Sequence, residues 1–216
     1  MQEFWQYRYQ LLEGLLLTVE LTVLAGFLAL LISLVVGTGV LSRYRTIRAI
    51  CRVYIEFFRG TSLLAQMFWL FFVLPNLGLD LSPLVCGVWS LGLCFGGYGA
   101  EIVRLSLMAV PKGQHDAAVA LNFSNLKALF HIYLPQSIVI MLPLFSNLLI
   151  ELLKATSLVS LITIAELTFQ AKNLIFLTYD TARILIFVLV VYFLLSQIIS
   201  RSLRGIENAM ARSWRA

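Results

Sequence analysis

Charged residues are scarce in this chain of 216 residues. Asp, Glu, Lys and Arg together make up 12% of the sequence, whereas 60% of it is hydrophobic. Soluble domains are about 25% charged and about 45–50% apolar, so the composition excludes an ordinary soluble enzyme and a disordered chain. The balance is typical of an integral membrane protein.

Cysteine and histidine are also few. Cys51, Cys86 and Cys94 show no C-x-x-C spacing, and the two histidines stand 16 residues apart without an H-E-x-x-H motif. These patterns predict neither a disulfide framework nor a metal site. The sequence contains no G-x-x-x-x-G-K-[ST] loop and no G-x-S-x-G motif. We therefore expect no ATP binding, no cofactor and no enzyme activity within this chain.

Five stretches without Asp, Glu, Lys or Arg are long enough to cross a bilayer, which takes about 20 residues. They are 21–42, 60–79, 81–100, 128–150 and 184–200. Because helix ends can extend past such windows, we expect spans at about 14–42, 48–75, 83–109, 135–154 and 180–203. The runs are continuously apolar rather than alternating, which favours helices over barrel strands. The sequence thus predicts one all-α transmembrane domain over 1–216.

Basic residues are concentrated in alternate connections between these spans. They are Arg43, Arg45, Arg48 and Arg52, then Arg104, Lys112 and Lys127, then Arg201, Arg204, Arg212 and Arg215. The positive-inside rule places these regions and the C-terminus in the cytoplasm, and five spans then leave the N-terminus outside. The net charge of +5 is therefore explained by topology, and we expect no nucleic-acid partner. The glycine run at 96–99 lies within a span and predicts close helix packing.

The connection at 111–131 is more than a simple turn. Residues 114–121 favour a short helix with Ala117, Ala118 and Leu121 on one face. Asn122 tolerates the left-handed conformation that ends a helix, so a second short helix can follow after a sharp corner. The residues alone leave two readings open: the unit receives a protein partner, or it packs on its own bundle.

A second polar segment follows the fourth span. Glu151 and Lys154 are three residues apart and share a helix face, and Thr156 and Ser157 add hydroxyl groups. This chemistry suits a zwitterionic solute, so these four residues are candidates for a solute pathway, with Glu101 of the third span as a fifth. The alternative is a structural Glu–Lys pair between helices.

The segment 116–135 resembles the cytoplasmic signature of permease subunits of bacterial ABC importers. That signature reads E-A-A, three residues, G, nine residues, then I-x-L-P. This chain has D-A-A at 116–118, Asn122 in the glycine position, and I-Y-L-P at 132–135. The spacing matches throughout, and the two differing residues, Asp116 and Asn122, preserve the acid and the tolerance of positive φ.

Further segments are similar to the polar-amino-acid branch of these permeases. R-G-T-S-L-L at 59–64 resembles R-G-T-P-L-L, and E-I-V-R at 101–104 and P-K-G-Q at 111–114 are typical of the branch. L-L-K-A-T-S-L at 152–158 resembles L-L-K-D-T-S-L, with Ala155 in place of Asp. The resemblance extends from about residue 14 to about residue 207.

This resemblance implies the type I ABC importer permease fold in the bacterial inner membrane. A coupling helix would carry Asp116, Ala117, Ala118, Leu121 and Asn122 into a groove of a separate ATPase dimer, which would hold ATP and Mg. A second permease, identical or paralogous, would complete the pathway, and a periplasmic binding protein would deliver a polar amino acid or a derivative such as an opine or ectoine.

The alternative function is an ion-gradient-driven secondary transporter or channel. Such proteins need carboxylates near mid-span and often show an internal repeat. Mid-span positions here are uncharged. Dependence of uptake on ATP rather than on the ion gradient distinguishes the two classes.

Overall fold

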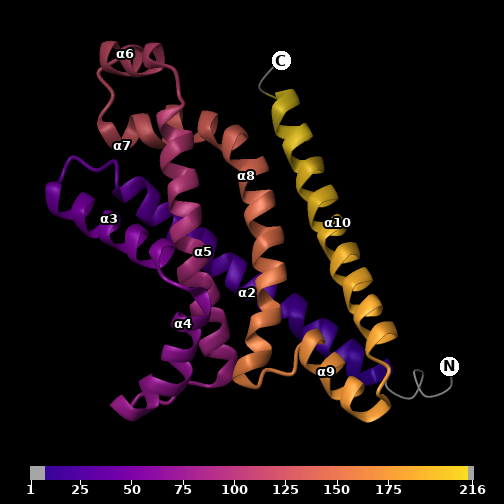
Figure 1. Cartoon of the computed structure of the whole chain (residues 1–216). Helices are drawn as coiled ribbons and strands as arrows, with labels where there is room; N and C mark the ends of the chain where they lie inside the picture. Colours follow the sequence, from indigo (N-terminus) through magenta and orange to yellow (C-terminus); the bar gives the residue numbers. More distant parts are fainter. Residues whose placement is uncertain (1–7, 214–216) are drawn as a thin grey trace.

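Four long apolar helices form the body of the molecule (Figure 1). The computed structural model describes residues 8–213, and every regular element in that range is a helix. The four are α2 (Arg8–Gly39), α5 (Pro83–Met108), α8 (Leu134–Ala155) and α10 (Thr181–Ser213). The ends of α8 continue into η3 (Leu129–Tyr133) and η4 (Thr156–Ile162). All four are long and apolar enough to cross a bilayer.

The segment expected as the second span, at about 48–75, is bent in the structure. Helix α3 (Arg45–Gly60) meets the run of α4 (Leu63–Phe68), η1 (Trp69–Val73) and η2 (Leu74–Leu77) at 101°. The chain turns at Thr61 and Ser62, whose backbones are extended. Helix α3 carries Arg45, Arg48, Arg52 and Arg59, whereas the following segment is uncharged as far as Leu79. Because arginine is costly inside hydrocarbon, the bend separates a basic helix from an apolar one.

Small residues bring α2 and α5 into close contact. On α2 they are spaced four residues apart along one buried face: Ala25, Ala29, Ser33 and Gly37. On α5, a Cβ added at Gly96 would lie 2.7 Å from the Ile32 side chain. The expectation that the glycine run at 96–99 packs helices together is thereby confirmed.

The largest hydrophobic core lies where α2, α4, α5, α8 and η4 meet. Its fully buried members include Leu21, Met67, Leu91, Leu152 and Ile162. A second core joins α9 (Leu167–Thr178) to α10 and to the start of α2, around Leu11, Leu174 and Ile184. These two cores fix η4 and α9 between the long helices.

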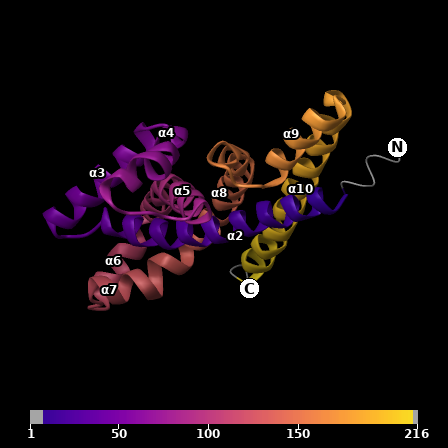
Figure 2. The same ribbon diagram turned by 90° about the horizontal axis from the view of Figure 1, so that it is seen from below.

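The short helices gather at opposite ends of the body. Helices α6 (Lys112–Ala120) and α7 (Asn125–Ala128) project at the same end as the C-terminal end of α10, whereas α9 lies at the other end beside the start of α2 (Figure 1). Seen along the other direction, α3 and α4 lie on one side of α5 and α8, and α9 and α10 lie on the other (Figure 2). The predicted coupling unit and α9 are therefore separated by the full length of the bundle.

Candidate coupling surface and solute pathway

The connection at 111–131 forms two short helices joined by a sharp corner, as the sequence predicts. Helix α6 ends at Ala120, and Asn122 adopts the left-handed conformation with φ of 53°. The backbone N–H of Phe123 donates to the Ala118 carbonyl at 3.0 Å and so closes the helix end. Ser124 accepts a hydrogen bond from the Lys127 N–H at 3.4 Å at the start of α7.

Helix α6 offers an acidic and apolar surface to the surroundings. Val119 and Leu121 are 77% and 66% exposed, and Asp116, Ala117 and Asn122 are exposed as well. Ala118 is only 2% exposed. The sequence analysis placed Ala118 with Ala117 and Leu121 on one face, and the resemblance assigned all three to the coupling helix, whereas the structure buries Ala118 against the chain itself. The available surface is thus formed by Asp116, Ala117, Val119, Leu121 and Asn122.

The unit is tied to both neighbouring long helices. It follows α5 directly in the chain, and the Gln136 amide in α8 donates to the Gln114 side chain in α6 at 3.2 Å. A displacement of α6 would therefore act on α5 and α8 together. The two-helix unit is thus connected both to α5 and to α8.

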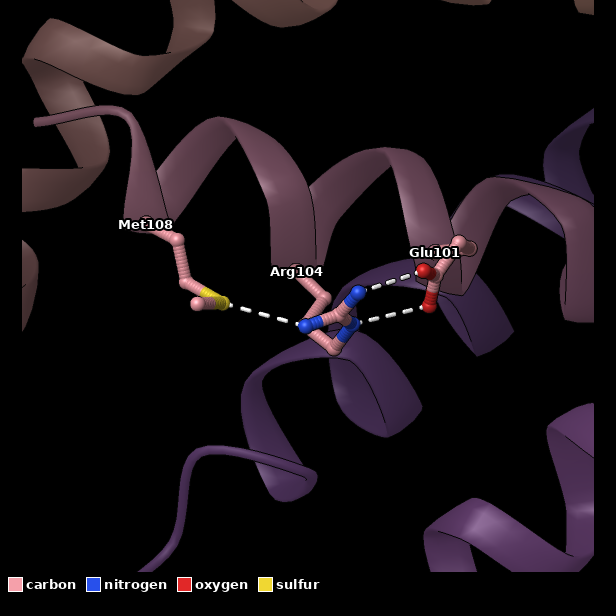
Figure 3. A network of polar contacts seen from close by, with 3 residues as sticks. All are labelled: Glu101, Arg104 and Met108. Carbon is pink, nitrogen blue, oxygen red and sulfur yellow. Dashed lines mark hydrogen bonds and ion pairs between the residues drawn. The ribbon is translucent and has the colours of Figure 1, made fainter.

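Glu101 is engaged by an arginine of its own helix (Figure 3). Arg104 donates from Nε to Oε2 at 2.8 Å and from Nη2 to Oε1 at 2.6 Å, which is a bidentate pair. Its Nη1 lies 3.0 Å from the Met108 sulfur. The side chains of Arg104 and Glu101 are 26% and 24% exposed. The Arg59 guanidinium lies 5.5 Å from the ring centre of Tyr98 on the same helix as Glu101.

The structure does not bring the five expected pathway residues together. Because α5 and α8 run in opposite directions, Glu101 lies near the α6 end, whereas Glu151, Lys154, Thr156 and Ser157 lie at the opposite end (Figure 1). Glu151 and Lys154 are exposed, and no ion pair joins them among the contacts of the described residues.

The two hydroxyl groups of this set bond to their own backbone. Thr156 is fully buried and donates to the Leu153 carbonyl at 2.7 Å, and Ser157 donates to the Lys154 carbonyl at 2.8 Å. Ala155 packs against the main hydrophobic core. The charges of Glu151 and Lys154 are therefore the polar groups that this segment presents at the surface of the chain.

Glu166 is a buried polar residue that the sequence analysis did not single out. It is 0% exposed and caps the start of α9, where it accepts hydrogen bonds from the N–H groups of Thr168 and Phe169, each at 2.8 Å. The sequence indicates a helical turn or two over 166–172, but glutamate is not among the usual N-cap residues, so its capping role was not expected. The sequence feature that could have identified Glu166 is its position as a lone carboxylate directly after the apolar run 158–165. Across the described residues, no group of three His, Cys, Asp or Glu side chains is placed to hold a metal ion.

Residues 15–212 match the family described as the binding-protein-dependent transport system inner membrane component. The chain belongs to this family. It is 46% identical over 209 residues to a probable amino-acid ABC transporter permease, y4tF, of Sinorhizobium fredii, covering 94% of this chain and 87% of the relative. It is 35% identical to the L-cystine permease TcyB of Bacillus subtilis, covering 80% and 73% of the two chains. For the octopine permease OccM of Rhizobium radiobacter, the identity is 33% and the coverage 95% and 88%.

Solved structures agree with this assignment. A crystal structure described as an amino acid ABC transporter with histidines has a TM-score of 0.89 and 31% identity, covering 96% of this chain and 97% of that chain. The MetNI methionine ABC transporter has the same fold, with a TM-score of 0.80 and 21% identity over 95% and 98% of the two chains. The fold is that of the type I ABC importer permeases, as the resemblance implied. This protein is thus a multi-pass inner-membrane permease subunit of an ATP-driven importer, from a family of non-catalytic subunits that work with ATPase and binding-protein partners.

Proposed function

We propose that the chain forms one half of the translocation pathway for a polar amino acid or an amino-acid derivative. The names of the relatives support this solute class, since they include permeases for amino acids, for L-cystine and for octopine. A second permease subunit, identical or paralogous, completes the pathway. ATP and Mg bind to the partner ATPase dimer, and a periplasmic binding protein delivers the solute at the end of the bundle that carries α9.

The proposal that α6 binds the ATPase rests on the exposed surface of this helix. Val119 and Leu121 are large apolar side chains that project from the end of the bundle away from its cores. Together with Asp116 they offer an apolar patch with one acidic group, which suits a groove on a protein partner. Burial of this patch by the ATPase explains why such side chains face outward on the side expected to be cytoplasmic.

Glu151 and Lys154 line the proposed solute pathway. Their exposed charges of opposite sign can contact the ammonium and carboxylate groups of a zwitterionic solute in the assembled pathway. Thr156 and Ser157 hold the backbone after α8 in a tight helical turn through their bonds to Leu153 and Lys154. Glu101 acts at the other end, where its pair with Arg104 fixes the cytoplasmic part of α5.

The coupling proposal is tested by introducing a charge on the α6 surface. In the reconstituted complex, Leu121→Asp should remove co-purification of the ATPase or lower solute-stimulated ATP hydrolysis by about tenfold or more, because an unpaired carboxylate would be buried in the partner's groove. Leu121→Met preserves the apolar contact and should behave as wild type. Tyr179→Asp places the same charge at an 88% exposed site at the opposite end and should leave the ATPase bound. Normal assembly and normal ATP-driven uptake in Leu121→Asp would overturn the proposal.

A further inference from the structure

Glu166 is a carboxylate with no exposure, held by neutral donors from two different helices. Besides its two backbone bonds at the start of α9, its Oε2 accepts a hydrogen bond from the Tyr192 hydroxyl of α10 at 3.1 Å. The Tyr192 hydroxyl also lies 3.2 Å from the Thr168 hydroxyl, so it contacts α9 at two points. A buried carboxylate is stable only when such donors replace its hydration.

The same end of α9 is joined to α2. The Thr18 hydroxyl accepts from the Leu167 N–H at 3.1 Å, donates to the Gly14 carbonyl at 2.8 Å and lies 3.5 Å from Glu166 Oε2. The backbones nearly touch, because a Cβ added at Gly14 would lie 3.1 Å from the Leu167 Cα. Three helices, α2, α9 and α10, therefore meet at one carboxylate, and α2 is distant from the other two in sequence.

This junction also holds the segment proposed to support the solute pathway. Lys172 of α9 donates to the Ser160 hydroxyl of η4 at 3.1 Å. Thr156, the first residue of η4, is fully buried. The position of η4 is thus set by the main hydrophobic core together with its contact to the helix that Glu166 caps.

We infer that Glu166 is a positioning residue that ties α2, α9 and α10 into one rigid body carrying η4 during transport. The outer ends of α2 and α10 then keep their separation while the bundle alternates between its two states. Capping alone would require only the two backbone bonds, which a shorter carboxylate also provides. The additional reach of glutamate is what brings the Tyr192 hydroxyl of α10 into the junction.

The test compares Glu166→Asp, Tyr192→Phe and the double variant in the full importer. Aspartate keeps a carboxylate cap for α9 but is one methylene too short to reach Tyr192 in the same position, and phenylalanine removes the donor. Loss of the bond should shift the equilibrium between joined and separated α9 and α10 by roughly tenfold, the factor associated with a hydrogen bond to a charged group, and so lower the solute transported per ATP hydrolysed. The double variant should resemble either single variant, because all three lack the same bond.

A distance measurement gives a readout that a simple cap would not change. Spin labels at the exposed positions Leu16 on α2 and Leu189 on α10, in a background with the native cysteines replaced by alanine, report the separation of these two helices. In the wild-type complex, one narrow distance should persist with and without trapped ATP. Both single variants should add a second, longer population.

Ser196→Ala is the matched control. The Ser196 hydroxyl is buried on α10 and donates to the Tyr192 carbonyl at 2.8 Å, so its removal deletes a bond within one helix only. It should leave the distance and the transport ratio unchanged. The inference is overturned if the wild-type distance changes between nucleotide states, or if Glu166→Asp and Tyr192→Phe lower only the melting temperature.

Of the two readouts, only the ratio of solute to ATP rests on the proposed transport function. Leu121→Asp should retain the narrow distance, so failure of the coupling proposal is distinguishable from failure of this one.

Discussion

Gly37 of α2 lies directly against the backbone of Ala100 in α5: a Cβ added at Gly37 would lie 2.7 Å from the Ala100 carbonyl oxygen. It would also lie 2.6 Å from the Cβ of Val103. Neither neighbour is the flexible end of a long side chain. The close packing of α2 on α5 therefore depends on the absence of a side chain at this position.

Gly37→Ala should destabilise the protein even though alanine is the better helix former. Separating the two helices to admit a methyl group should cost about 1–3 kcal/mol, as overpacking does elsewhere. The melting temperature of the detergent-solubilised complex measures the effect. Gly205→Ala is the control, because nothing lies within 4 Å of the added Cβ there, and it should be neutral or gain up to about 1 kcal/mol. This packing would be contradicted if the melting temperature of Gly37→Ala were equal to or higher than that of Gly205→Ala.

Asn122 is the non-glycine residue with positive φ at the corner between α6 and α7, where its φ is 53°. Asn122→Gly should preserve the corner and full transport, since glycine adopts this conformation without steric cost. Asn122→Val should be strained by about 1–2 kcal/mol, because a β-branched side chain disfavours the left-handed region. The measurement is solute-stimulated ATP hydrolysis, which should fall for valine and stay unchanged for glycine. Equal activity of the two variants would show that the corner does not need this conformation.

Some of these features could be predicted from the sequence because they depend on local chemistry. The apolar windows identified the long helices, and the helix-forming run 114–121 followed by Asn122 predicted the two short helices and the corner between them. The orientation of Ala118 could not be predicted, since a helix of nine residues has faces that only its packing against the body defines.

The contacts between residues far apart in the sequence could not be predicted either. The chain bends by 101° between the charged helix that ends at Gly60 and the uncharged segment that follows it. Hydropathy indicates where charges are absent, but it does not indicate the angle between two helices. Glu166 and Thr18 are 148 residues apart, so their proximity follows from the packing of α9 against α2. Glu101 was grouped with Glu151 by chemistry alone, although antiparallel helices place the two at opposite ends of the bundle.

The pair of Glu101 and Arg104 should contribute measurably because it is bidentate and only about one-quarter exposed. Arg104→Gln and Glu101→Gln should each lower stability by about 0.5–1 kcal/mol, and the double variant should lose less than the sum of the two. The control is Arg183→Gln, whose side chain is 79% exposed in its pair with Asp180 and whose loss should change the melting temperature little. Strict additivity of the two single variants would show that the pair is energetically uncoupled.

The bend between α3 and α4 provides a test in which a substitution should stabilise the protein. Ser62 has φ of −72° and ψ of 130°, which are values that proline adopts, and its hydroxyl forms no cap hydrogen bond. Thr61 before it is extended, as a residue preceding proline must be. Ser62→Pro should therefore raise the free energy of unfolding by about 0.4–1 kcal/mol by restricting the unfolded chain.

Thr61→Pro introduces proline one residue earlier and should have the opposite effect on stability. The Thr61 N–H donates to the Phe57 carbonyl at 3.1 Å, and its φ of −111° is outside the range of proline. It should lower the melting temperature of the complex, whereas Ser62→Pro raises it. Thr61→Pro also removes a hydroxyl that donates to the Phe57 carbonyl at 2.8 Å and accepts from the Gln66 amide. Thr61→Ala loses the same hydroxyl and keeps the N–H, so Thr61→Pro should melt below Thr61→Ala if the backbone geometry of the bend is responsible. If both prolines destabilise to the same extent, the chain does not turn at Thr61 and Ser62 with these dihedral angles.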